Sequence, residues 1–125
     1  MKQRLLTTFL FITSSLIFAQ NTDLEVKAFA EKIDNLENEQ LLDVRTPGEW
    51  KTGTIPNALK MNFMESNFKE QVSALDKDKP VLVYCAVGGR SAKAQQLLLQ
   101  WGFKEVYNLL GGINAWQNAG YELKK

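Results

Sequence analysis

A run of five residues at 80–84 (PVLVY) leads directly into Cys85, the only cysteine of the chain, and then into a loop with two glycines. The run is apolar throughout, as expected for a central parallel strand buried on both faces. The residues that follow, from Ser91 to Trp101, carry a helical apolar stripe, and Gly102 stands where a C-terminal cap is expected. This segment therefore predicts a strand, a tight loop and a helix in direct succession.

The rest of residues 21–125 alternates short apolar runs with helical patterns and contains no repeat, low-complexity tract or linker. Such alternation favours one compact α/β domain, with five strands in a mainly parallel sheet and helices on both faces. Besides 80–84, the predicted strands cover 40–44, 58–62 and 106–110, and the predicted helices cover 26–36, 49–51, 68–75, 91–101 and 113–118. Residues 22–25 (TDLE) resemble a helix-capping box, although a short strand just before the first helix also fits. Residues 46–48 (TPG) predict a turn.

The first twenty residues differ from the rest of the chain. Lys2 and Arg4 give a positive start, residues 5–18 are apolar apart from a few hydroxyl groups, and Ala19 offers a small residue for cleavage. This is the build of a secretory signal peptide. A membrane anchor and an N-terminal core helix are the alternatives, but the apolar run is shorter than the roughly 20 residues that span a bilayer. We expect a cleaved signal peptide over residues 1–20 and an exported, periplasmic protein that is free of the membrane after processing.

The composition excludes several classes of function. Without Lys2 and Arg4 the chain has 13 basic residues, two fewer than its full 15, against 14 acidic residues, and this balance does not indicate nucleic acid as a partner. One cysteine cannot form an internal disulfide, although exported small domains often use paired cysteines. The chain has no histidine, which excludes Cys–His and Ser–His catalysis and argues against a zinc site. We expect neither a metal nor a cofactor.

Cys85 is the candidate nucleophile, because it stands at a strand end that faces the first turn of a helix. Backbone N–H groups and the positive helix end both favour the thiolate there, and the thiolate is the nucleophilic form. We expect the two glycines to provide the backbone angles of a tight ring, and Arg90 to face the thiolate and an anionic donor. A buried inert cysteine and a solvated arginine are the alternatives. The candidate anion-binding residues are Ala86, Val87, Gly88, Gly89, Arg90 and Ser91.

Asp43 and Arg45 are candidate supporting residues. They stand at the end of the predicted strand 40–44, and we read both mainly as structural. A carboxylate at such a strand end is expected to pair with a cation or to accept N–H bonds.

Four segments in order resemble the signatures of the rhodanese family, specifically its small single-domain sulfurtransferases. Residues 42–50 (LDVRTPGEW) are similar to the first signature, and residues 53–58 (GTIPNA) are similar to the second. Residues 84–91 (YCAVGGRS) resemble the active-site loop with the start of its helix, and residues 108–116 (NLLGGINAW) resemble the closing motif. The resemblance covers essentially all of residues 21–125 and implies a rhodanese-like α/β fold.

The resemblance also implies an activity, which is transfer of a sulfane sulfur from thiosulfate or a persulfide donor to cyanide or a thiol. In this family the cysteine becomes a persulfide in a ping-pong reaction, and a protein thiol is a further candidate acceptor. Two positions depart from the pattern. Thr54 stands where His is common, and Ala86 follows the nucleophile where Arg is common. The loop therefore keeps Arg90 as its cation.

Two other functions remain open at this point. One is a sulfur-carrying or protein-binding module with little turnover of small donors, which the reduced positive charge of the loop allows. The other is a tyrosine-phosphatase-like or arsenate-reducing enzyme, since relatives of the fold hold an oxyanion in a similar loop. Those enzymes place five residues between cysteine and arginine, whereas four residues separate Cys85 from Arg90 here. The shorter loop suits a single sulfur atom.

Overall fold

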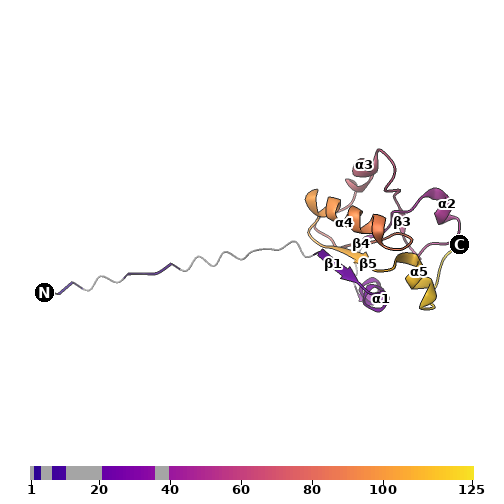
Figure 1. Cartoon of the computed structure of the whole chain (residues 1–125). Coiled ribbons are helices and arrows are strands. Elements are labelled where there is room, and N and C mark those ends of the chain that lie inside the picture. The colour runs from indigo at the N-terminus through magenta and orange to yellow at the C-terminus, as the bar shows by residue number, and fades with distance from the viewer. Residues whose placement is uncertain (1, 4–6, 11–20, 36–39) are drawn as a thin grey trace.

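A computed structural model describes residues 2–3, 7–10, 21–35 and 40–125 of the chain. Five strands form one sheet in the order β1-β5-β4-β2-β3, and every neighbouring pair is parallel (Figure 1). The strands are β1 (Asn21–Leu24), β2 (Gln40–Asp43), β3 (Leu59–Lys60), β4 (Val81–Tyr84) and β5 (Val106–Leu109). The predicted α/β class and parallel sheet are confirmed.

Five helices connect and cover the strands. They are α1 (Val26–Asn35), α2 (Pro47–Trp50), α3 (Phe68–Val72), α4 (Gly89–Gln100) and α5 (Gly112–Asn118). Helices α3 and α4 lie on one face of the sheet, and α1 and α5 lie on the other (Figure 1). Helices lie on both faces of the sheet, as predicted. A site can therefore form at the end of the sheet where the carboxyl ends of the parallel strands meet.

The core divides into two apolar clusters because successive residues of a strand point to opposite faces. Strand β4 contributes to both clusters, and all four of its side chains are buried. The first cluster includes Val81, Val83, Phe68, Val72, Ala94 and Leu98. The second includes Leu82, Tyr84, Phe29, Ile113 and Trp116. This burial explains why the run at 80–84 is apolar throughout.

Gly102 caps the carboxyl end of α4, as predicted. This glycine has φ +98°, its N–H donates to the carbonyl of Leu99, and the N–H of Phe103 donates to the carbonyl of Leu98. These two bonds form a Schellman motif, which satisfies carbonyls that a helix end leaves free.

Several predicted boundaries are wrong. Residues 21–24 form β1, which pairs with β5, so the capping-box reading of residues 22–25 fails and the alternative of a short strand is correct. Pro47 begins α2 instead of a turn, because proline suits the first helical position and Thr46 and Glu49 hydrogen-bond at this helix start. Strand β3 and helix α3 are shorter than predicted. Leu36 and most of the expected signal peptide lie outside the described residues.

Two further features concern the helices and the acidic side chains of the part of the chain that the structure describes. None of its helices combines the length and the apolar character that a transmembrane span requires. Within the same residues, no group of three or more His, Cys, Asp or Glu side chains is placed to hold a metal ion.

Candidate active site

Cys85 follows the carboxyl end of β4, next to the point at which the chain order of the sheet changes direction. From β4 the chain continues to β5 on one side, whereas from β2 it continues to β3 on the other. Crevices outside such a switch point are the usual ligand sites of open parallel sheets. The Cys85 side chain is 1% exposed, at the floor of the loop that joins β4 to α4.

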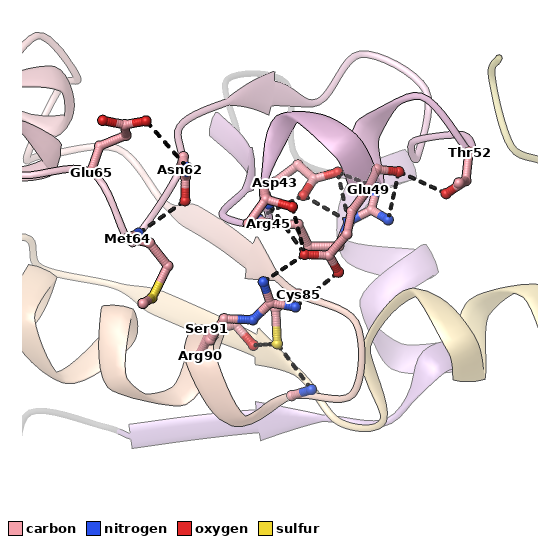
Figure 2. Close-up of polar contacts among 12 residues, drawn as sticks. Asp43, Arg45, Glu49, Thr52, Asn62, Met64, Glu65, Cys85, Arg90 and Ser91 are labelled. Carbon is pink, nitrogen blue, oxygen red and sulfur yellow. Dashed lines mark hydrogen bonds and ion pairs between the residues drawn. The ribbon is translucent and has the colours of Figure 1, made fainter.

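Two hydrogen bonds from the loop reach the sulfur. The backbone N–H of Gly88 lies 3.1 Å from Sγ. The hydroxyl of Ser91 lies 3.3 Å from the same atom (Figure 2). Gly88 has φ +104°, a conformation that L side chains rarely adopt, so the glycine prediction is correct at this position. Gly89 begins α4 without a positive φ, so the prediction that it supplies a special backbone angle is wrong.

The surroundings of Cys85 favour its thiolate. Burial acts to raise the pKa of the thiol, but hydrogen bonds from the Ser91 side chain and from the backbone of Ser91, Gly88 and Val87 outweigh it. The pKa of Cys85 therefore lies below its ordinary value, as the sequence predicted. A lowered pKa in a glycine-bearing loop at a helix N-terminus is typical of a reactive cysteine.

The amino end of α5 holds the loop from behind. The backbone N–H of Ile113 donates to the carbonyl of Cys85 at 2.9 Å, and the N–H of Asn114 donates to the carbonyl of Ala86 at 3.2 Å. These bonds occupy the first two carbonyls of the loop. Gly112 makes the approach possible, because a Cβ there would lie 2.5 Å from the carbonyl oxygens of Cys85 and Ala86. Gly112 was predicted only as part of the closing motif at 108–116, and this contact with the active-site loop was missed.

Arg90 is held by Glu49 of α2. Nη1 and Nη2 of Arg90 donate to the two carboxylate oxygens of Glu49 at 2.7 and 2.9 Å (Figure 2). This bond to Arg90 is the largest of several causes that lower the pKa of Glu49 to about 2. The pKa of Arg90 is raised, mainly by its hydrogen bond to Glu49 and further by the charge of Cys85. Glu49 was not among the predicted site residues, although a cation at a helix N-terminus calls for an anionic partner.

A buried polar network supports the site from below. The Asp43 carboxylate accepts a hydrogen bond from Arg45 Nη2 at 2.6 Å and another from the Tyr84 hydroxyl at 2.7 Å. The Tyr84 hydroxyl in turn accepts the N–H of Ile55, and Arg45 donates to the carbonyl of Gly53. Asp43 is fully buried and Arg45 is 3% exposed. The expected pairing of Asp43 is confirmed, and this network joins β2, β4 and the 53–55 segment.

Other predicted residues lie at the margins of the site. The Val87 side chain is 65% exposed, so it is the backbone of this residue that serves the thiol. Ala86 lines a hollow of about 310 Å³ together with Glu49, Thr52, Asn114 and Gln117. Thr54 is buried, its backbone pairs with Lys124, and it is not among the residues that line the hollow.

Asn108 is a further residue that the sequence analysis missed. Its side-chain nitrogen lies 3.5 Å from the carbonyl of Gly88 and 3.2 Å from a carboxylate oxygen of Asp23. The residue is buried on β5, so it links the active-site loop to the sheet. Its place within the closing motif was the available signal.

Comparison with known proteins agrees with this geometry. Residues 25–119 match the family model of the rhodanese-like domain. A sulfurtransferase from Allochromatium vinosum is 35% identical over 98 residues, which are 78% of this chain and 90% of that protein. The thiosulfate sulfurtransferase GlpE of Coxiella burnetii is 35% identical over 102 residues, which are 82% of this chain and 90% of that protein.

Comparison with solved structures indicates the same family. A rhodanese-related protein from Thermoplasma volcanium superposes with a TM-score of 0.72 at 33% identity, and the match covers 82% of this chain and 97% of that one. The four sequence motifs, the family model, the relatives and the fold agree, and the chain therefore belongs to the rhodanese family.

Proposed function

We propose that the protein is a sulfurtransferase in which Cys85 accepts a sulfane sulfur from thiosulfate or a persulfide and passes it to cyanide or a thiol. The observation that carries the proposal is the pair of hydrogen bonds from Gly88 and Ser91 to the Cys85 sulfur. Two relatives at 35% identity are named sulfurtransferase and thiosulfate sulfurtransferase, which supports the same class.

In the first half-reaction the Cys85 thiolate attacks the outer sulfur of thiosulfate. A bond forms between the two sulfur atoms, the sulfur–sulfur bond of the donor breaks, and its electron pair leaves with sulfite. In the second half-reaction cyanide attacks the outer sulfur of the persulfide, thiocyanate leaves, and the Cys85 thiolate is restored. This is nucleophilic catalysis through a covalent intermediate, with ping-pong kinetics.

The loop suits both forms of Cys85 in this cycle, the thiolate and the persulfide. The thiolate and the terminal sulfur of a persulfide are both anions. Both are stabilised by hydrogen-bond donors that need no reorientation during the reaction. The N–H of Gly88 and the hydroxyl of Ser91 are such donors. Carbonyls that would repel an anion are already engaged at Cys85 and Ala86 by the amino end of α5.

A sulfur carrier that exchanges sulfur with a protein partner is the second candidate. Glu49 neutralises the charge of Arg90, which weakens the attraction of the loop for small anions. Val87 exposes an apolar side chain at the loop, which a protein surface would cover. A carrier would form the same Cys85 persulfide but would turn over slowly with thiosulfate and cyanide.

We also propose that residues 1–20 direct export and that the protein acts in the periplasm. The basic start, the apolar run and Ala19 support this. Expression of the full chain in a bacterium with two membranes tests it. Cleavage after residue 19 or 20, with the protein in the periplasmic fraction, is the expected result. Full-length protein in the membrane fraction would contradict it.

The test of the proposed function is thiocyanate formation from thiosulfate and cyanide by residues 21–125, with the wild type beside Cys85→Ala. Activity in the wild type that is lost in Cys85→Ala is the expected result. Activity that persists in the folded variant would overturn the role of Cys85. Absence of turnover in a wild type that still forms the persulfide would favour the carrier.

A further inference from the structure

The ion pair between Glu49 and Arg90 lies at the mouth of the site. Their side chains are 32% and 29% exposed, whereas Cys85 behind them is 1% exposed. Figure 2 shows the Arg90 guanidinium between the Glu49 carboxylate and the Cys85 sulfur. A donor that approaches the sulfur along Arg90 therefore meets the negative charge of Glu49.

We infer that Glu49 is a specificity-determining residue that makes the site disfavour dianionic sulfur donors and prefer donors of lower charge, such as organic persulfides and thiosulfonates. The inference rests on the proposed sulfurtransferase function and names its substrate class. Its basis is the bidentate contact, in which both carboxylate oxygens of Glu49 are bonded to Arg90.

Charge arithmetic gives the direction of the effect. Arg90 is the cation of the loop, and its two terminal nitrogens are already engaged by Glu49. Thiosulfate brings two negative charges to the site beside the Glu49–Arg90 pair, whereas a thiosulfonate brings one. Because Coulomb energy scales with the product of the charges, Glu49 repels the dianion about twice as strongly as the monoanion.

The neighbouring hollow fits the same class of donor. It has a volume of about 310 Å³ and opens beside Ala86 and Glu49. Thr52, Asn114 and Gln117 offer it hydroxyl and amide groups, which bind uncharged polar groups of an organic donor. Arg45 also lines it, but its guanidinium is bonded to the buried Asp43 carboxylate.

Glu49→Gln is the appropriate substitution because Glu49 also serves the start of α2. Its Oε1 accepts the hydroxyl of Thr46 at 3.0 Å and the N–H of Thr46 at 3.3 Å. Glutamine keeps a carbonyl oxygen for these bonds and removes the charge. The matched control is Asp78→Asn, which removes the same charge from an exposed ion pair with Lys104, outside the site.

The experiment measures kcat/KM for thiosulfate and for methanethiosulfonate, with cyanide as the acceptor, in the wild type, Glu49→Gln and Asp78→Asn. The two donors share the sulfane sulfur and differ by one charge, because a methyl group replaces an oxygen. Attack on methanethiosulfonate forms the same Cys85 persulfide and releases methanesulfinate with the electron pair of the broken bond. We expect Glu49→Gln to raise kcat/KM for thiosulfate about tenfold, through KM, and for methanethiosulfonate about threefold.

Asp78→Asn should leave both values unchanged. The deciding quantity is kcat/KM for thiosulfate divided by kcat/KM for methanethiosulfonate. If an active Glu49→Gln variant left this ratio unchanged or lowered it, the inference would be overturned and the proposed function would stand. A merely structural role of Glu49 would lower both values together, which also counts against the inference. If no variant turned over either donor or formed a persulfide, the proposed function would fall and the inference with it.

Discussion

The Ser91 hydroxyl lies 3.3 Å from the Cys85 sulfur, reaching it from the first turn of α4. Ser91 is fully buried, so this hydroxyl is shielded from water and held by the helix. A hydrogen-bond donor fixed in this way stabilises the thiolate more than water would, because the hydroxyl needs no reorientation. Ser91 thereby opposes the burial of Cys85, which on its own would keep the thiol protonated.

Ser91→Ala should raise the pKa of Cys85, because the variant loses the hydroxyl that donates a hydrogen bond to the sulfur. Below the pKa the thiol is protonated and unreactive, so the rise of alkylation rate with pH should move to higher pH in the variant. The rate of iodoacetamide reaction across pH measures this. Ser73→Ala, which removes an exposed hydroxyl bond at the end of α3, is the control. Identical profiles for Ser91→Ala and the wild type would contradict the role given to this hydroxyl.

Gly112→Ala should disrupt the loop. A Cβ at this position meets backbone atoms of Cys85 and Ala86 at 2.5 Å, and the φ of +59° adds about 1–3 kcal/mol of strain. We expect a destabilised protein with at least tenfold lower sulfurtransferase activity, measured by urea unfolding and by initial rates.

Gly89→Ala is the matched control for that change. Gly89 is also the first residue of a helix next to the active-site loop, but a Cβ there has open space and its φ is not positive. Unfolding free energy within about 0.5 kcal/mol of the wild type, or slightly higher, is expected. Equal effects of the two substitutions would show that the contact with α5 is unimportant.

Asp43→Asn should be strongly destabilising, although the residue does not touch the thiol. The substitution leaves the Arg45 guanidinium buried without its counter-charge, which costs about 3–5 kcal/mol. The exposed pair of Asp78 and Lys104 offers a comparison, since breaking it by Asp78→Asn should cost far less, because water screens both charges. Urea unfolding of both variants measures the difference. A small effect at Asp43 would mean that water reaches Arg45.

The Glu49–Arg90 pair should contribute stability that depends on pH. The pKa of Glu49 is lowered from 4.5 to about 2 in the folded protein, so the contribution is present above about pH 4.5 and is lost as pH falls toward 2. Both side chains are about one third exposed, so the contribution should not exceed about 1 kcal/mol. The difference in unfolding free energy between the wild type and Glu49→Gln should therefore shrink on acidification. A difference that grows toward low pH would contradict this.

Local patterns were sufficient for the central elements. Strand β4, helix α4 and the cap at Gly102 were predicted because apolar continuity, helical spacing and a terminal glycine all act within one segment. The start of the domain was predicted with two alternatives, because residues 22–25 fit a helix cap locally and the pairing partner of β1 lies 85 positions away in β5.

In the site, too, local sequence patterns predicted only the residues that are close together in the chain. Cys85 and its loop residues adjoin in sequence, so their grouping was predictable from the motif. Glu49 lies 41 positions from Arg90, and only the packing of α2 over the loop brings the two together. The expectation that Arg90 would stand ready for a donor therefore missed its partner within the chain. The contact of Gly112 with the loop was also missed, since a glycine in the closing motif does not reveal which backbone it approaches.

The most direct test of the account is the intact mass of residues 21–125 after incubation with a sulfane-sulfur donor, beside Cys85→Ala. The account predicts a gain of about 32 Da, the mass of one sulfur atom, in the wild type alone, and its loss on addition of cyanide. A wild type that gains no mass with either thiosulfate or a persulfide donor, or a gain that persists in Cys85→Ala, would contradict the assignment of Cys85 as the sulfur-carrying residue.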